Sequence, residues 1–293
     1  MTRSAVFFSY GSQPDIDYII SSSEAWPFDE ILIAIGGDVK LPEMTKSGKN
    51  GKIRIFHEEE RLGKIASYNR IIKEVKGNFV FLISGDVRFE PDTPLKLLNL
   101  ADDNVGLVIP RIVPSTGESL AQKVGFTIWN THEIFNTLRA RSGKFFCGGE
   151  FQLILGTHPT IPEWIINDDE YLGNLIYASG KKIVYCKEAI VQNETPRSFI
   201  RLLQQRVRVN YGHFQCLKLF GNTSSFSFEF ARNFRESLSI LRKLVLGESV
   251  NIFTLFLAVY VEFTSIVISR VDFLFNVDMR KWKLVNSDVR SSK

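Results

Sequence analysis

Continuous apolar runs alternate with helical patterns in the first third of the chain. The runs are Ser4–Ser9, Glu30–Ile35, Ile53–Phe56 and Phe79–Ile83. Strands that are apolar on both faces are typical of a parallel sheet with helices on each side. Between the runs, residues 16–24 and the segment after Gly63 have helical spacing. The alternation predicts an α/β fold with a Rossmann-like open sheet.

The pattern between about residues 105 and 195 is more mixed, and it predicts both strands and helices. We expect strands at 105–112, 123–129, 182–185 and 189–192, a helix at 133–141, and a helix that ends at Ser179 before Gly180. With these elements a first domain would cover residues 1–195.

From Pro196 onward the pattern becomes amphipathic and then apolar. Phe199, Leu202, Arg206 and Val207 have helical spacing, and a second helical pattern covers about residues 226–246. The run Ile252–Ser269 carries one charge, Glu262, and its length reaches the lower limit for a membrane span. We expect interface helices over residues 196–247 and a transmembrane or re-entrant segment with a basic tail over 248–293.

Composition changes this picture little. The formal charge of +4 is too small to predict a nucleic-acid partner. Cys147, Cys186 and Cys216 form no C-x-x-C pair, which predicts neither a disulfide framework nor a zinc site and favours a reducing compartment. The N-terminus becomes polar too quickly for a signal peptide and is expected to be the first strand.

Polar residues follow the predicted strands, where open α/β sheets bind their ligands. Tyr10, Asp38 and Asp86 all lie at such carboxyl ends. Two other charged segments occur later, Asn167–Glu170 and Gln204–Arg208. An aspartate after a strand can simply turn the chain, acids at a helix start are favoured by the helix dipole, and a basic helix can lie on a membrane surface. The order of the segments gives them a more specific meaning.

In that order the segments resemble GT-A glycosyltransferases of family 2, closest to the cellulose-synthase-like branch and its archaeal-type mannosyltransferases. Residues 79–91 resemble the Asp-x-Asp segment, with Ser84 in place of the first acid. Residues 60–69 are similar to the Gly-Lys…Asn segment, and 165–173 to the acidic pair followed by Leu-Gly. Residues 205–209 resemble Gln-x-x-Arg-Trp, with Val209 in place of tryptophan.

The resemblance implies a role for each motif. Asp86 would hold Mg²⁺ or Mn²⁺, Asp169 would be the general base, and Arg208 would neutralise the departing diphosphate. The residues implied in nucleotide binding are Tyr10, Asp38, Lys64, Asn69 and Gly85, and those implied in acceptor binding are Gly149, Asp168 and Gln205. Loss of the aromatic residue at Val209 favours a single or short transfer over a long polymer track.

We therefore expect an inverting, metal-dependent hexosyltransferase. Its donor would be a GDP- or UDP-hexose, with GDP-mannose favoured. Two glycines replace the acidic residues that many relatives carry after the second strand, where one contacts uracil, so the family's base preference does not carry over and guanine is an alternative to uracil. Its acceptor would be a lipid-linked saccharide at the cytoplasmic face of a membrane. The alternatives are a non-catalytic sugar-nucleotide- or membrane-binding protein derived from a transferase, and a sugar nucleotidyltransferase. The last is disfavoured because residues 9–13 contain no basic side chain.

Overall fold

A computed structural model describes residues 2–10, 12–36, 51–58, 63–115, 117–228, 238–239, 242 and 251–279, with only the backbone of Tyr10. Asp38 and most of the helix predicted at 226–246 lie outside the described residues. The chain forms two compact units, one of residues 1–111 and 148–192 and one of 112–147 and 193–293. Residues 112–147, which the sequence assigned to the first domain, belong to the second of these units.

The sheet has eight strands in the order β3-β2-β1-β4-β7-β6-β8-β5. Their bounds are β1 Arg3–Tyr10, β2 Glu30–Gly36, β3 Ile53–Glu58, β4 Phe79–Ser84, β5 Arg88–Phe89, β6 Val105–Pro114, β7 Phe151–Leu155 and β8 Lys182–Asn193. The strands β3, β2, β1 and β4 are parallel, as their apolar runs predict. Strand β7 is antiparallel to β4 and β6, so the sheet is mixed.

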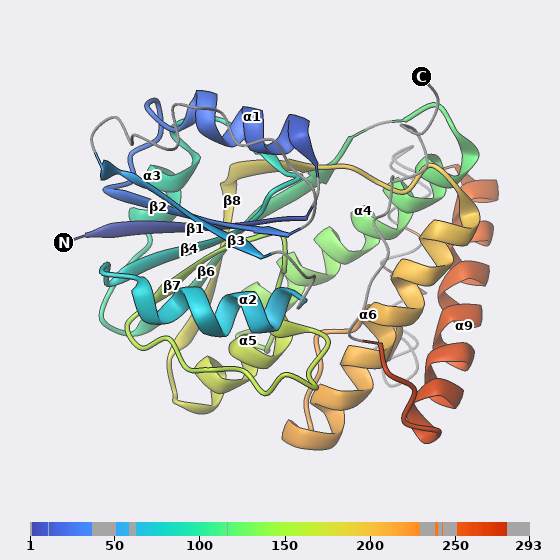
Figure 1. Cartoon of the computed structure of the whole chain (residues 1–293). Helices are drawn as coiled ribbons and strands as arrows, with labels where there is room; N and C mark the ends of the chain where they lie inside the picture. Colours follow the sequence, from blue (N-terminus) through green and yellow to red (C-terminus); the bar gives the residue numbers. More distant parts are fainter. Residues whose placement is uncertain are drawn as a thin grey trace. The chain divides into compact units, whose positions relative to one another are not determined.

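Helices cover both faces of the sheet in the first unit (Figure 1). They are α1 Gln13–Ser22, α2 Lys64–Ile71 with a 3₁₀ turn at Ile72–Glu74, α3 Thr93–Leu98 and α5 Asp168–Ala178. Phe7 stacks on Trp26, and Tyr18 of α1 contacts Trp26 edge-on. The next residue, Phe8, instead contacts α2, because the ammonium of Lys64 lies over its ring. Because successive strand residues point to opposite faces, α1 and α2 cover opposite sides.

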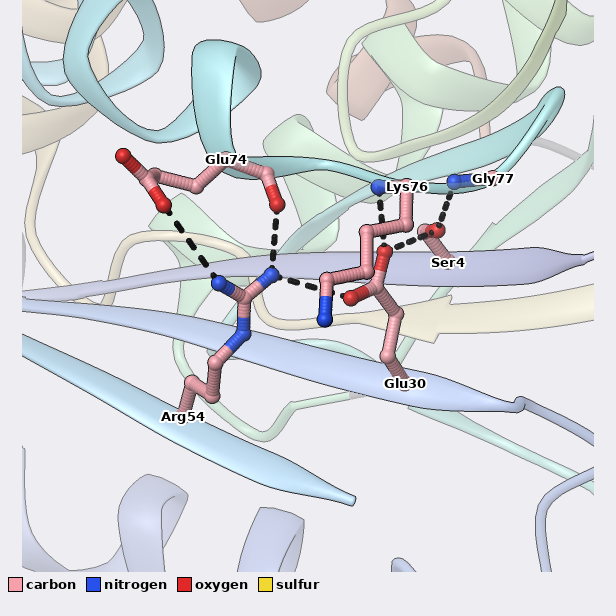
Figure 2. A network of polar contacts seen from close by, with 6 residues as sticks. All are labelled: Ser4, Glu30, Arg54, Glu74, Lys76 and Gly77. Atoms are coloured by element: carbon pink, nitrogen blue, oxygen red, sulfur yellow. Dashed lines mark hydrogen bonds and ion pairs between the residues drawn. The ribbon is translucent and has the colours of Figure 1, made fainter. Parts of the chain in front are cut away.

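A polar network joins the amino-terminal ends of three parallel strands (Figure 2). Glu30 accepts hydrogen bonds from the Ser4 hydroxyl at 2.5 Å and the Lys76 amide at 2.7 Å. Its other oxygen pairs with Arg54 of β3 at 2.9 Å, and Arg54 also donates to the Glu74 carbonyl at 2.5 Å. The network ties β1, β2 and β3 to the turn before β4, at the edge away from the strands' carboxyl ends.

The second unit contains the helices α4 Leu120–Arg141, α6 Phe199–Phe220 and α9 Ile252–Leu274, and α9 packs against the other two (Figure 1). Its apolar core consists of Val124, Ile128, Leu202, Ala258 and Val261. Polar side chains also join the helices. The Arg206 Nε lies 2.5 Å from a carboxylate oxygen of Glu262, Asn210 donates to Ser265 at 2.8 Å, and Thr127 donates to Thr254 at 3.1 Å.

One predicted strand is a helix in the structure, and two other predicted strands are continuous. The strand expected at 123–129 is part of α4, which begins with a capping box between Ser119 and Gln122. Val124, Thr127 and Thr131 are buried at helical spacing, so the apolar, β-branched run reflects one face of a helix. The two short strands expected at 182–185 and 189–192 are one strand, β8.

Candidate active site

The centre of the candidate site is the carboxyl end of β1 and β4. The strand order changes direction at this pair, and open α/β sheets bind ligands at such a point. The Gly85 amide, just beyond β4, donates to the Phe8 carbonyl at 2.8 Å. A Cβ on Gly85 would lie 2.8 Å from the Ser9 Cβ, so only glycine permits this approach. The close contact fixes where the next residue, Asp86, emerges.

Asp86 is accessible to solvent at this edge. Protein atoms packed around its carboxylate, together with the negative charge of Asp15, raise its pKa. Arg88 holds the loop, because it pairs with Asp15 at 2.6 Å, lies 4.2 Å from the centre of the Tyr18 ring, and donates to the Val87 carbonyl at 2.9 Å. A carboxylate that is both accessible and crowded is suited to bind a cation.

The acidic pair lies in the first turn of α5, where the helix dipole favours negative charge. Asp168 is buried, and its Oδ2 lies 2.8 Å from the Nζ of Lys64 on α2. Asp169 points toward the loop before β7, since a Cβ on Gly149 would lie 3.0 Å from the Asp169 Oδ2. The two carboxylates thus have different neighbours, a cation for Asp168 and a glycine backbone for Asp169.

Lys64 is the cation among these acids. Burial opposes its charged form, but the carboxylates of Asp168, Asp169 and Glu150 outweigh that effect and raise its pKa. Its ammonium also lies 5.7 Å from the centre of the Phe8 ring. Lys64 therefore remains charged at neutral pH, at the start of a helix and beside the end of β1.

Glu150 belongs to the same group, although the sequence did not indicate it. Burial and the negative charges of Asp169 and Asp86 raise its pKa to about 7, and Lys64 opposes the shift. Its backbone carbonyl accepts a hydrogen bond from the Ser84 amide at 2.8 Å. The only sequence signal is an acid directly before an apolar strand, and its relevance depends on the pairing of β7 with β4.

Asn69, whose motif implies a contact with the nucleotide, forms hydrogen bonds to the protein backbone in this structure. Its amide donates to the Ile161 carbonyl at 2.7 Å and accepts from the Ile161 amide at 2.8 Å. The neighbouring Tyr68 hydroxyl donates to the Pro159 carbonyl at 3.0 Å. In this structure Asn69 holds the segment that leads from β7 to the acidic pair of α5, because both ends of its amide are used there.

The first unit thus brings together Lys64, Gly85, Asp86, Gly149, Asp168 and Asp169. Tyr10 is placed only by its backbone at the end of β1, and Asp38 lies outside the described residues. Gln205 and Arg208 are half-buried residues of α6 in the second unit. Beside Gly85, the buried Ser9 hydroxyl has no hydrogen-bond partner among the described residues, which leaves it available to a ligand.

The donor chemistry at this edge fits a hard divalent cation. Mg²⁺ and Mn²⁺ prefer oxygen ligands, and in nucleotide sites they use one or two carboxylates plus phosphate oxygens. Within the described ranges no three metal-binding side chains form a complete cage. Asp86 is exposed at the carboxyl ends of β1 and β4. It therefore suits a site in which the protein supplies part of the metal ligands and the substrate's phosphates supply the others.

Comparison with known proteins identifies the fold and the family of the chain. An open sheet of this order, covered by helices and with acids at its carboxyl edge, is the GT-A fold. The chain belongs to the family described as glycosyl transferase family 2, whose profile matches residues 4–155. It is therefore a glycosyltransferase. No curated relative matches the chain.

The chain was matched to two solved structures of glycosyltransferases. The mannosyltransferase PcManGT from Pyrobaculum calidifontis, in complex with GDP-Man and Mn²⁺, is 14% identical, with a TM-score of 0.62 over 94% of this chain and 88% of that chain. Glucosyl-3-phosphoglycerate synthase from Mycobacterium tuberculosis, in complex with Mn²⁺, UDP and phosphoglyceric acid, is 16% identical, with a TM-score of 0.45 over 73% and 78%. At 14% identity the likeness to the Pyrobaculum enzyme is one of fold.

Proposed function

We propose that the protein is an inverting, metal-dependent hexosyltransferase that uses a nucleoside-diphosphate sugar and an acceptor hydroxyl. The proposal is carried by one observation. Asp86, Lys64 and Asp169 come from three separate elements and interact at the carboxyl edge of β1 and β4. They would supply a metal ligand, a cation for the diphosphate and a base.

Asp169 is the proposed base. An alcohol is a weak nucleophile at neutral pH, and a carboxylate that accepts its proton during attack contributes roughly 10²–10⁴-fold. The hydroxyl oxygen would form a bond to the anomeric carbon while the bond to the diphosphate oxygen breaks. The acceptor's proton passes to Asp169. A single displacement of this kind inverts the anomeric configuration.

Lys64 and Asp86 act on the diphosphate side. The ammonium of Lys64, at the start of α2, is held by Asp168 and can attract phosphate oxygens together with the helix N-terminus. Asp86 would hold Mg²⁺ or Mn²⁺, which when bound neutralises charge on the leaving diphosphate. Arg208 and Gln205 are assigned to the leaving group and the acceptor on the strength of the sequence motif.

GDP-mannose is the donor that we favour, with a UDP-hexose as the alternative. The support is limited to the missing acid after β2 and to the GDP-Man named with the Pyrobaculum structure. Incubation with a panel of GDP- and UDP-sugars and Mn²⁺, with release of the nucleoside diphosphate as the readout, tests the assignment. If no donor releases its nucleoside diphosphate, by hydrolysis or by transfer to an added acceptor, the chain is a non-catalytic binding protein instead.

Attachment to a membrane through α9 is also proposed, with a lipid-linked saccharide as acceptor and the catalytic unit on the cytoplasmic side. Helix α9 is long and apolar enough to cross a membrane, with 23 residues, a mean hydropathy of 2.0, and 28% of its most apolar window buried. Its large exposed side chains include Phe256, Tyr260 and Phe263, each more than 60% exposed. Soluble surfaces rarely expose so contiguous an apolar stripe.

A further inference from the structure

Ser84 leaves the metal-binding segment with one acid fewer than the family pattern has. The carboxylate of Asp86 remains, but a serine hydroxyl is a neutral and weaker ligand for a divalent cation. A carboxylate that could replace the acid missing from β4 lies at the start of the neighbouring strand, β7. Glu150 lies directly across from Ser84, because the antiparallel register pairs Ile83 with Phe151 and the Ser84 amide donates to the Glu150 carbonyl at 2.8 Å.

Residues directly opposite each other in an antiparallel pair point to the same face, with Cβ atoms about 4.5–5.5 Å apart. That face can be identified from β1. Ser84 is in register with Phe8, whose ring lies under the ammonium of Lys64 on α2. The Glu150 side chain therefore points to the α2 side of the sheet, in agreement with its electrostatic interactions with Lys64, Asp169 and Asp86.

The charge at this edge leaves room for a cation. Lys64 is paired with Asp168, and Arg88 is paired with Asp15. The negative charges of Asp169 and Asp86 both oppose ionisation of Glu150 and raise its pKa. Gln152, two residues beyond Glu150 on the same face of β7, is buried and its amide has no hydrogen-bond partner among the described residues. Strand β7 thus presents a buried polar side chain that the described protein atoms do not satisfy.

We propose that Glu150 supplies, from β7, the second metal-binding carboxylate that Ser84 does not provide on β4. The proposal rests on the metal-dependent transfer proposed above. Asp86 and Glu150 would hold the cation between the ends of β4 and β7, and the donor diphosphate would supply further oxygens. Glu150 would thus replace the carboxylate that is missing at Ser84, from the position directly opposite on the neighbouring strand. The site would keep its negative charge although the motif on β4 has only one acid.

The test is a titration of Mn²⁺ into protein saturated with GDP or UDP, whichever the wild type binds, followed by calorimetry. Glu150→Gln keeps the shape of the side chain and should weaken Mn²⁺ binding by about tenfold or more, because a full charge beside a divalent ion is lost. Adding Ser84→Asp to that variant should restore most of the affinity. Glu163→Gln, an exposed acid in the segment before α5, is the matched control and should bind Mn²⁺ as the wild type does.

Thermal unfolding without metal separates this role from a structural one. Glu150→Gln removes one of several mutually repelling acids, so its unfolding midpoint should equal or exceed that of the wild type. The assignment would be overturned if Glu150→Gln bound Mn²⁺ as tightly as the wild type. It would also be overturned if Ser84→Asp did not restore the Mn²⁺ affinity that Glu150→Gln had lost. A wild type that binds nucleotide with no dependence on Mn²⁺ would instead contradict the proposed metal-dependent function.

Discussion

The Nζ of Lys64 lies 2.8 Å from the Oδ2 of Asp168, and this ion pair links the first turn of α2 to the first turn of α5. This ion pair gives the two adjacent acids of α5 different surroundings. Asp168 is engaged by a cation of the same unit, whereas Asp169 faces the glycine loop before β7. Two neighbouring carboxylates can therefore differ in function although they share one helix turn.

The first prediction concerns the base. Asp169→Asn keeps the size and hydrogen bonding of the side chain but removes the proton acceptor. Turnover should fall by roughly 10²–10⁴-fold, while the affinity for the donor, measured by calorimetry, stays close to that of the wild type. Asp168→Asn should mainly weaken donor binding, because it releases Lys64. Equal turnover of Asp169→Asn and wild type would show that the base is another residue.

Gly149 provides a second test of the same geometry. A Cβ at this position would lie 3.0 Å from the Asp169 carboxylate, so Gly149→Ala must displace the acid by a few tenths of an ångström. We expect kcat to fall about tenfold or more, with little change in donor KM, because proton transfer depends on the position of the carboxylate. Gly148→Ala is a matched control, since its Cβ would crowd the Ile109 side chain at 3.0 Å and no acid. Similar losses of kcat in both variants would indicate a general effect of loop distortion.

The outward face of α9 gives a prediction on membrane binding. Replacing Phe256, Tyr260 and Phe263 by serine should lower partitioning into lipid vesicles by roughly a thousandfold or more, at about 1.5–3 kcal/mol per large apolar side chain. The control replaces Leu95, Leu100 and Ile190, three exposed apolar residues of the first unit, by serine. Vesicle flotation measures both. Undiminished flotation of the α9 variant would mean that this face does not contact lipid.

His132 of α4 gives a prediction on pH. Burial, with a further contribution from Arg206, lowers its pKa to about 3, so the ring is neutral in the folded protein at neutral pH. Its unfolded pKa is about 6.5, and the unfolded chain therefore binds more protons between these two values. The contribution of His132 to stability is complete above about pH 6.5 and is lost, at roughly 1 kcal/mol per pH unit, as the pH falls toward 3.

His132→Gln should flatten this pH dependence. The free energy of unfolding in urea, measured in mild detergent at pH 7.5 and pH 5, should differ less between the two pH values in the variant than in the wild type. His57→Gln, an exposed residue of β3, is the control and should keep the wild-type slope. An unchanged slope in His132→Gln would mean that the acid sensitivity arises from other groups.

The sequence predicted the features that depend on local pattern. The runs that form β1, β2 and β4 are apolar on both faces, so their parallel pairing could be predicted, whereas β3 carries the charged Arg54 and is only partly buried. The run 123–129 misled because its β-branched and aromatic residues favour a strand, whereas the cap at Ser119 and burial every three or four residues impose a helix. A local pattern does not show which of two periodicities the tertiary contacts select.

Features that depend on distant pairing could not be predicted. Glu150 gains its place from a register with Ser84, and Asn69 from hydrogen bonds to Ile161, 92 residues away along the chain. The charge of Glu262 within an apolar helix had no evident partner in the sequence. Its partner, Arg206, lies 56 residues earlier on α6, and only the packing of the two helices brings them together.

The polar contacts of α9 also limit how interchangeable this helix is. Its inner side carries Glu262, Ser265 and Thr254, each matched to a particular partner on α6 or α4. A generic hydrophobic anchor grafted in its place would leave Arg206 buried beside hydrocarbon and Asn210 without its hydroxyl partner. Removing one member of a buried ion pair typically costs about 3–5 kcal/mol. Any redesign of α9 therefore has to keep it together with α4 and α6 as one unit, and only its outer side is open to change.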